Sequence, residues 1–143
     1  MREVKRSALL PYTALQVFDL VADVEKYPQF LPWCTAATVL GRDGEVVTAE
    51  LALARGRVRA RFTTRNRLVR GESLEMRLLE GPFNALEGRW DFLPIGEAGS
   101  RVELCMRFET QGTLAGLVLG PVFEGICNQL VDAFAQRARR VYG

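Results

Sequence analysis

The chain has 143 residues, of which 48% are apolar and 25% charged, and its formal net charge at pH 7 is +2. These values are ordinary for one soluble globular domain over residues 1–143, and such a small net charge does not indicate a nucleic-acid-binding protein. No window approaches the roughly 18 consecutive apolar residues of a membrane span, and Pro11 breaks the apolar start too soon for a signal peptide. The three separated cysteines lack a CxxC pair, which argues against disulfides and a zinc site. We therefore expect a cytoplasmic protein without a metal site.

The amino-terminal part of the chain predicts one strand followed by two short helices. The strand precedes Pro11, because proline cannot donate a hydrogen bond within a sheet. The first helix covers about residues 13–22, where Thr13 can cap the amino end. The second covers residues 24–29.

The segment after these helices is apolar, aromatic and interrupted by two prolines. Residues 27–34 read Tyr-Pro-Gln-Phe-Leu-Pro-Trp-Cys. Each proline lacks an amide hydrogen and restricts the residue before it, so the segment cannot form the middle of a helix or of a central strand. We expect a loop that lines the rim of a cavity, with simple plugging of the core as the alternative. The residues placed at this rim are Phe30, Leu31, Pro32 and Trp33.

The middle of the chain alternates between apolar and charged positions, which is the period of a β-strand. Between residues 57 and 68 the apolar side chains stand at even positions and the arginines at odd ones. The same parity recurs in later segments, and glycine-containing turns between them favour hairpin connections. The sequence therefore predicts an antiparallel meander with one dry face, which carries Phe62, Thr64, Trp90, Phe92 and Phe108.

The last part of the chain predicts one long amphipathic helix. From Thr113 to Tyr142 apolar side chains recur at intervals of three and four. Such a helix packs across the dry face of a curved sheet and tends to leave space beside it, toward which we expect Phe123 and Leu130 to point. Residues 114–123 are apolar on every side, so they need a further apolar surface: the aromatic loop, a second subunit or a bilayer. A dimer is possible, although the spacing does not demand one.

The predicted order of elements is that of an α+β helix-grip fold, with a curved antiparallel sheet of about seven strands around the long helix. Several separated motifs then resemble one family, the coenzyme Q-binding proteins of the START-like, polyketide-cyclase-like superfamily, whose bacterial members are also described as ribosome-association toxins. The motifs are Pro11-Tyr12, Tyr27-Pro28, the loop from Phe30 to Cys34, Phe62 to Asn66, Gly81-Pro82-Phe83, and Leu86, Gly88, Trp90, Phe92 and Pro94.

The resemblance implies that the space between sheet and helix binds an isoprenoid quinone, most simply ubiquinone, and that the protein is a carrier or chaperone supporting respiratory electron transport. An apolar tunnel suits the quinone tail, while the head group needs one or two donors, for which Thr64, Asn66, Asn128 and Gln129 are candidates. Exchange of this ligand implies peripheral contact with the cytosolic face of the inner membrane. The expected ligand contacts are Phe30, Leu31, Pro32, Trp33, Phe62, Thr64, Phe83, Trp90, Phe92, Phe108, Phe123 and Leu130. Ordinary core packing explains each of these side chains equally well.

An arginine-rich segment supports the alternative function. Arginines that share one predicted strand face could bind phosphates of ribosomal RNA through paired hydrogen bonds. In this interpretation the protein is a ribosome-association toxin that binds the large ribosomal subunit and blocks subunit joining. Glutamates on neighbouring strands would neutralise part of this face, and anionic lipid headgroups are a further possible partner. The arginines are Arg55, Arg57, Arg59, Arg61, Arg65 and Arg67.

Catalysis is the least supported class of function. The chain contains no histidine, which removes the commonest general base near neutral pH. Most carboxylates fall on the charged parity of the strands, and only Glu124 and Asp132 on the long helix are candidates to face inward. We therefore expect a binding protein rather than an enzyme.

Overall fold

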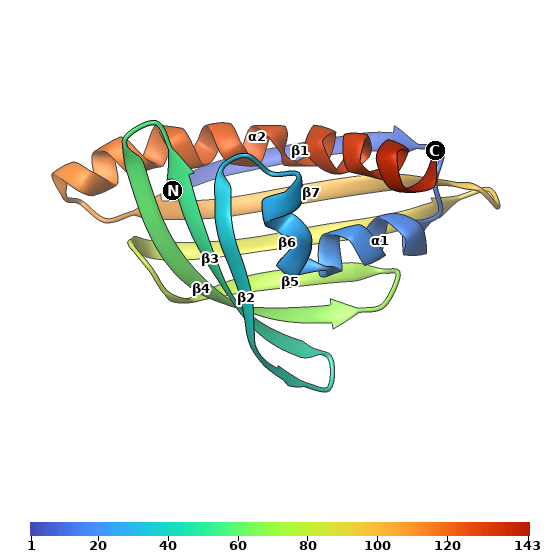
Figure 1. The fold of residues 1–143 in the computed structure, drawn as a ribbon, viewed down its shortest axis with the longest axis horizontal. Helices are drawn as coiled ribbons and strands as arrows, with labels where there is room; N and C mark the ends of the chain where they lie inside the picture. The colour runs from blue at the N-terminus through green and yellow to red at the C-terminus, as the bar shows by residue number, and fades with distance from the viewer.

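The computed structural model describes all residues from 1 to 143 and shows one curved sheet with a long helix lying along it (Figure 1). The fold is α+β, as the residue patterns predicted. The elements in chain order are β1 (Arg2–Leu10), α1 (Ala14–Ala22), the 3-10 helix η1 (Val24–Gln29), β2 (Cys34–Asp43), β3 (Val46–Arg55), β4 (Val58–Val69), β5 (Ser73–Glu80), β6 (Phe83–Ile95), β7 (Gly99–Thr110) and α2 (Leu114–Tyr142).

The sheet has seven strands in the order β1-β7-β6-β5-β4-β3-β2. All neighbouring strands are antiparallel, so β2 to β7 form the predicted meander and β1 joins it beside β7. The helix α2 contacts β1, β7 and β4, while α1 packs on α2, β6 and β7 and η1 packs on β2. This is the helix-grip arrangement: a curved sheet holds one long helix and the two short helices close the space at one side (Figure 1).

Local chemistry sets the ends of the two α-helices. Thr13 precedes α1 and forms a capping box, in which its side chain accepts from the backbone of Gln16 and the Gln16 side chain accepts from Thr13 N–H. Thr113 caps α2 by accepting from the backbone N–H of Gly116. The structure keeps α2 helical through Pro121, which has no N–H to donate to the preceding turn.

A tight turn joins β3 to β4 and matters for the surface described below. Only Gly56 and Arg57 separate the two strands, and Gly56 has a φ of 59°. A two-residue hairpin loop needs a positive φ at its first central residue, which glycine adopts without steric cost. The turn places the exposed Arg55 and Arg57 close to one another at the end of the hairpin.

The core lies between the sheet and its helices. Phe92, Phe108 and Phe134 are its largest fully buried side chains, and α2 also contributes Phe123 and Ile126. The helix α2 contains an 18-residue window of mean hydropathy 1.4, enough by length and composition for a membrane span, and 39% of that window is buried. Its buried stripe identifies it as the core helix of this fold.

Candidate functional site

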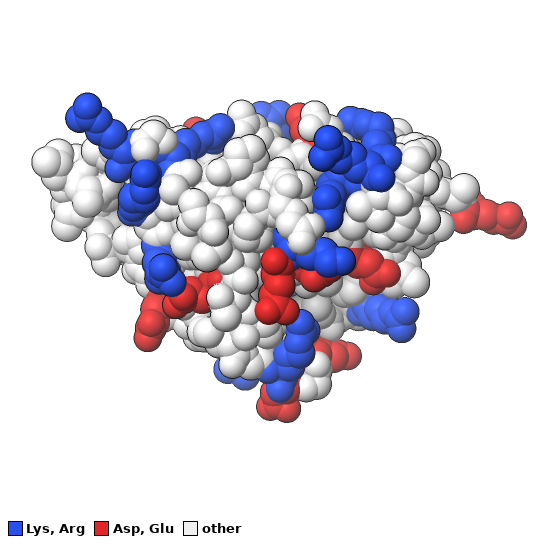
Figure 2. All heavy atoms as spheres, in the orientation of Figure 1, with Lys and Arg blue, Asp and Glu red and all other residues white.

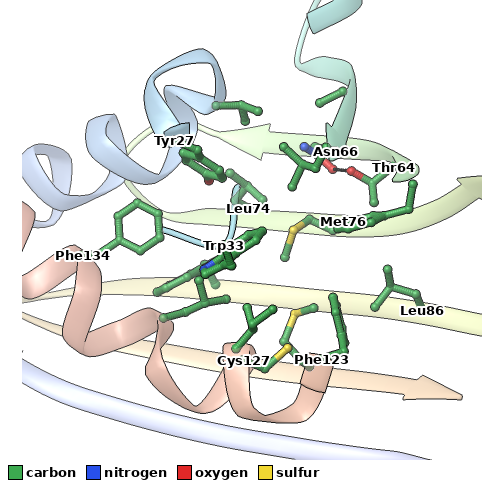
Figure 3. Close-up of a pocket in the computed structure, with 18 residues that line it drawn as sticks. Tyr27, Trp33, Thr64, Asn66, Leu74, Met76, Leu86, Phe123, Cys127 and Phe134 are labelled. Carbon is green, nitrogen blue, oxygen red and sulfur yellow. Dashed lines mark hydrogen bonds between the residues drawn. The ribbon is translucent and has the colours of Figure 1, made fainter. Parts of the chain in front are cut away.

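A small apolar cavity lies between the inner face of the sheet and α2 (Figure 3). Its volume is about 60 Å³, and 16 of its 18 lining residues are hydrophobic. The lining comes from η1, the aromatic loop, strands β3 to β7 and α2. The residues are Val24, Tyr27, Trp33, Ala49, Leu51, Phe62, Thr64, Asn66, Leu74, Met76, Leu86, Trp90, Met106, Phe123, Ile126, Cys127, Leu130 and Phe134.

Aromatic rings close the cavity where η1 meets α2. The ring of Phe134 lies 5.5 Å from that of Tyr27, 5.3 Å from Phe30 and 5.4 Å from Trp90, each edge to face. Edge-to-face pairs stabilise such contacts beyond the area that they bury. The Tyr27 hydroxyl donates to the Val21 carbonyl oxygen, and burial raises the pKa of Tyr27 further above its ordinary value. This cluster, the aromatic closure, separates the cavity from solvent on that side.

The polar groups of the cavity lie together on β4. Thr64 and Asn66 are both buried, and the Thr64 hydroxyl donates to Asn66 Oδ1 at 2.8 Å (Figure 3). The Asn66 amide nitrogen makes no hydrogen bond to the protein. If this nitrogen were fully shielded, it would be a buried polar atom without a partner, but Ser100 Oγ is the only side-chain atom of that kind. The nitrogen of Asn66 therefore borders free space, where it can donate to a ligand oxygen.

The titratable groups in the lining are neutral near pH 7. Burial, and to a smaller extent the charge of Glu124, raises the pKa of the Cys127 thiol to about 12. Burial also raises the pKa of Tyr27 and keeps it in its neutral form. No carboxylate, lysine or arginine lines the cavity. The cavity can therefore bury apolar groups and donate a hydrogen bond, but these groups do not exchange protons readily at neutral pH.

Half of the predicted ligand contacts line this cavity. The sheet contributes Phe62, Thr64 and Trp90, the loop contributes Trp33, and α2 contributes Phe123 and Leu130. Their contact with a ligand stays a prediction. Met76, Ile126 and Phe134 also line the cavity and were not among the predicted contacts, although Met76 shares the dry parity and the other two lie on the apolar stripe of α2.

The other six predicted contacts lie outside the cavity. Phe92 is stacked behind Trp90 and its ring lies 5.6 Å from that of Phe18 in α1, while Phe83 and Phe108 pack against the far side of Phe123. Strand parity identifies the inner face but not the position along the strand, and the cavity occupies only part of that face. The residues that do not line the cavity in this structure are Phe30, Leu31, Pro32, Phe83, Phe92 and Phe108, and their contact with a ligand stays a prediction.

The aromatic loop is divided between rim and plug. Trp33 lines the cavity, but Leu31 is buried in the core as a plug. Phe30 and Pro32 border a separate surface groove beside α2, where the Arg137 guanidinium carbon lies 4.8 Å from the Phe30 ring centroid. The loop from Phe30 to Trp33 was predicted correctly. Trp33 lines the cavity, Phe30 belongs to the aromatic closure at its edge, and Leu31 is a plug.

The polar residues predicted on α2 turn away from the cavity. Asn128 accepts from Arg6 Nε at 3.0 Å and Gln129 accepts from Arg55 at 3.0 Å, both at the surface. Glu124 pairs with Arg2 at 3.2 Å, and Asp132 is exposed. None of these α2 side chains serves the cavity, because successive helical residues are rotated by about 100° and Cys127 and Phe134 already occupy the inward directions.

The arginine-rich segment does not form one continuous face. Arg55 shares the parity of the inner residue Leu53 on β3, and its guanidinium reaches Gln129 on α2. Arg57 lies in the turn, and Arg61 forms an ion pair of 2.8 Å with Glu50 on the outer face. The prediction of six arginines on one face was therefore wrong for Arg55 and Arg57.

Farther along β4, two arginines lie on the outer face, and their neighbours on β3 are uncharged. On the β3 side, Arg65 is directly opposite Thr48 and Arg67 is opposite Val46. On the β5 side, Arg65 is opposite another arginine, Arg77. Like charges directly opposite one another destabilise a sheet, so this arrangement favours an anion between them.

The acidic residues near these arginines already have other partners. Glu75, opposite Arg67, is paired with Arg89, and Glu87, opposite Arg77, accepts from Arg107 at 3.3 Å. Arg65, Arg67 and Arg77 themselves make none of the ion pairs in the structure. These three, the arginine triad, border a surface hollow together with Val46 and Glu75.

Comparisons with known proteins agree with this fold. Residues 10–135 match the family described as polyketide cyclase / dehydrase and lipid transport. An 18 kDa protein of Caulobacter crescentus is 34% identical, with a TM-score of 0.77 over 100% of this chain and 99% of that one. The Zhui aromatase/cyclase from Streptomyces has a TM-score of 0.86 over 97% and 94% of the two chains but is 19% identical, so it shows the fold alone.

Curated relatives place the chain more narrowly. The ribosome association toxin RatA of Pseudomonas aeruginosa is 49% identical over 98% of this chain and 97% of its own length. A mitochondrial coenzyme Q-binding protein COQ10 homolog B of Xenopus laevis is 31% identical over 99% of this chain and 59% of its own. The chain therefore belongs to the START-like polyketide cyclase / dehydrase and lipid transport family.

Proposed function

We propose that this protein associates with the ribosome. The observation that carries the proposal is its 49% identity, over nearly the full length of both chains, with a relative named ribosome association toxin. Relatives of Vibrio cholerae and Escherichia coli with the same name are 40% and 39% identical over at least 99% of this chain. In its finer form, the proposal is that the protein binds the large ribosomal subunit and blocks subunit joining.

The arginine triad is the surface best suited to ribosomal RNA. Guanidinium groups donate paired hydrogen bonds to phosphate oxygens, and the three arginines of the triad have no competing ion pair. A phosphate between Arg65 and Arg77 would also remove the repulsion between these directly opposed charges. Arg61 contributes less, because Glu50 already neutralises it.

Sucrose-gradient profiles of lysates to which the purified protein is added test this proposal. We expect the wild-type protein to reduce the monosome peak and increase the free subunits, while the double variant Arg65→Glu, Arg67→Glu leaves the profile unchanged. The matched control is Arg139→Glu, Arg140→Glu, which reverses two exposed arginines at the end of α2 and alters the net charge equally. Equal loss in both double variants would contradict a local phosphate site, and an inactive wild type would contradict the function.

Binding of a hydrophobic ligand, with ubiquinone the first candidate, is a second proposed function. The apolar cavity and the unpaired Asn66 amide nitrogen favour it, and the COQ10 homolog supports it at lower identity. The cavity of about 60 Å³ is far below the roughly 300–1,000 Å³ of ordinary ligand sites. A quinone therefore requires the aromatic closure to open between η1 and α2.

Organic extraction of the purified protein followed by mass spectrometry tests this second function. We expect co-purified isoprenoid quinone in the wild type and its loss in Trp33→Ala and Asn66→Leu. Leu93→Ala is the matched control, because Leu93 is an exposed apolar residue outside the cavity. A protein that carries no quinone even when expressed in quinone-producing cells would remove this proposal and leave ribosome association untouched.

Both proposed functions are binding rather than turnover. The neutral cavity lining supports this view, although cyclases share the fold. A cytoplasmic location with peripheral membrane contact accompanies the second function, with ubiquinone as a bound ligand and not as a catalytic cofactor.

A further inference from the structure

The first turns of α2 expose apolar side chains that the fold does not cover. Leu114 is 81% exposed, Leu117 69% and Val118 52%. Figure 1 shows this end of α2 extending beyond the sheet. Pro121 lies in the same stretch, so the carbonyl of Leu117 receives no hydrogen bond from the following turn. We call Leu114, Leu117 and Val118 the apolar tip.

Positive charge gathers beside the apolar tip. Arg55, Arg57 and Arg59 are exposed around the β3–β4 turn, and none of them makes an ion pair with a carboxylate. The Arg55 guanidinium donates to Gln129 on α2 and also lies beside Gly125, which is about 10 Å along the helix axis from Val118. Figure 2 shows Lys and Arg side chains next to the uncharged surface at the start of α2.

The one carboxylate on the first turns of α2 is already neutralised. Glu124 pairs with Arg2 at 3.2 Å, and the Arg2 guanidinium also lies against Gly120. The start of α2 therefore combines exposed apolar side chains with a surplus of arginine charge. This combination is typical of elements that lie in the interface of an anionic bilayer.

A second copy of the chain fits this surface poorly. A stable protein interface buries roughly 1,200–2,000 Å² and involves about 20–30 residues on each side, whereas the apolar tip offers three exposed side chains. Two-fold pairing would also bring Arg55 and Arg57 near their own copies. RNA phosphates would account for the arginines but not for the leucines, because RNA bases stack on aromatic side chains and the apolar tip has only aliphatic ones.

We propose that the apolar tip and the β3–β4 turn dock onto a membrane of anionic phospholipids. Leu114, Leu117 and Val118 enter the apolar edge of the headgroup layer, while Arg55, Arg57 and Arg59 contact the phosphates. Phe123, which lines the cavity, follows Val118 by about 7.5 Å along α2, so docking brings this side of the cavity toward the bilayer. The proposal uses a surface separate from the arginine triad and does not depend on ribosome association.

Co-flotation of the purified protein with lipid vesicles tests the proposal. The vesicles are phosphatidylcholine alone, or phosphatidylcholine with about one-third phosphatidylglycerol, an anionic lipid. We expect binding to the anionic vesicles only, and a loss of more than tenfold in Leu117→Glu, because this change removes an inserted side chain and adds a repelled charge. Arg57→Glu should weaken binding by about fivefold or more, and high salt should weaken wild-type binding.

Leu9→Glu is the matched control, since Leu9 is 68% exposed but lies at the end of β1. It should bind vesicles like the wild type. Absence of wild-type binding, or equal losses in Leu9→Glu and Leu117→Glu, would overturn the proposal. So would a dimer, detected by light scattering, that Leu117→Glu dissociates. Ribosome association measured in the same Leu117→Glu preparation should be unchanged, which separates a failure of this proposal from a failure of the proposed function.

Discussion

A single charge placed beside the arginine triad should weaken ribosome binding without unfolding the protein. Thr48 lies on the outer face of β3 directly opposite Arg65, and no charged residue occupies that position in the wild type. In Thr48→Glu the new carboxylate forms a cross-strand pair with Arg65 and competes with a ribosomal phosphate. No arginine is removed, so the effect arises only from occupation of Arg65.

The expected magnitudes follow from general values for such contacts. A cross-strand ion pair stabilises by roughly 0.2–1 kcal/mol, and the lower strand propensity of glutamate offsets part of this, so the free energy of unfolding should change by less than about 1 kcal/mol. Loss of one phosphate contact reduces the slope of log K against log salt by roughly 0.7–0.9. At about 0.1 M salt this amounts to a five- to eightfold weaker association.

The assay is equilibrium binding to purified ribosomal subunits over a series of salt concentrations, with urea denaturation as the measure of stability. Thr48→Gln is the control, because glutamine has nearly the same shape as glutamate but no charge. The affinity and salt slope of this variant should equal those of the wild type. The reasoning is refuted if Thr48→Glu keeps the wild-type slope, or if the Gln and Glu variants weaken binding equally.

Further predictions concern the core and the cavity. Phe134→Ala should lower the free energy of unfolding by about 3–5 kcal/mol in urea denaturation, because it removes a buried ring that contacts Tyr27, Phe30 and Trp90; a loss below about 1 kcal/mol would contradict the role of the aromatic closure. Burial raises the pKa of Cys127 from 9.0 to about 12, so the folded state holds this proton more tightly than the unfolded state, and stability should be full below pH 9 and fall as the pH rises from 9 toward 12. Cys127→Ala should show a shallower decline in urea denaturation across this range, and an unchanged decline would show that the Cys127 thiol does not cause it. In the wild type, the same thiol should resist a maleimide at pH 8 until urea unfolds the chain, whereas modification under native conditions would contradict its burial.

Local patterns predicted the fold because they act over short distances. The alternation in β4 and the spacing in α2 each identify a face, and a curved sheet with one long helix has few ways to bury both. Pro32 correctly indicated the loop from Phe30 to Trp33, whereas Pro28 lies inside η1. Thr13 and Thr113 stand at the starts of their helices as caps.

The candidate site was harder to predict because it depends on which inner side chains other elements cover and on which residues of neighbouring strands lie opposite one another. Parity correctly turned Phe92 and Phe108 inward but could not show that α1 and Phe123 cover them. The hairpin turn at Gly56 reverses which parity faces inward, so Arg55 belongs to the inner side of β3 although it shares odd numbering with Arg65. The arginine triad could be recognised only from the strand register, which places Arg77 opposite Arg65.

The most direct experiment on ribosome association is sedimentation of the purified protein with separated large and small ribosomal subunits. We expect the wild-type protein to co-sediment with the large subunit at low salt. The Arg65→Glu, Arg67→Glu variant should stay at the top of the gradient, while Leu117→Glu and Arg139→Glu, Arg140→Glu should sediment like the wild type. Failure of the wild type to sediment with either subunit, or sedimentation of the Arg65→Glu, Arg67→Glu variant to the same extent as the wild type, would contradict the proposal.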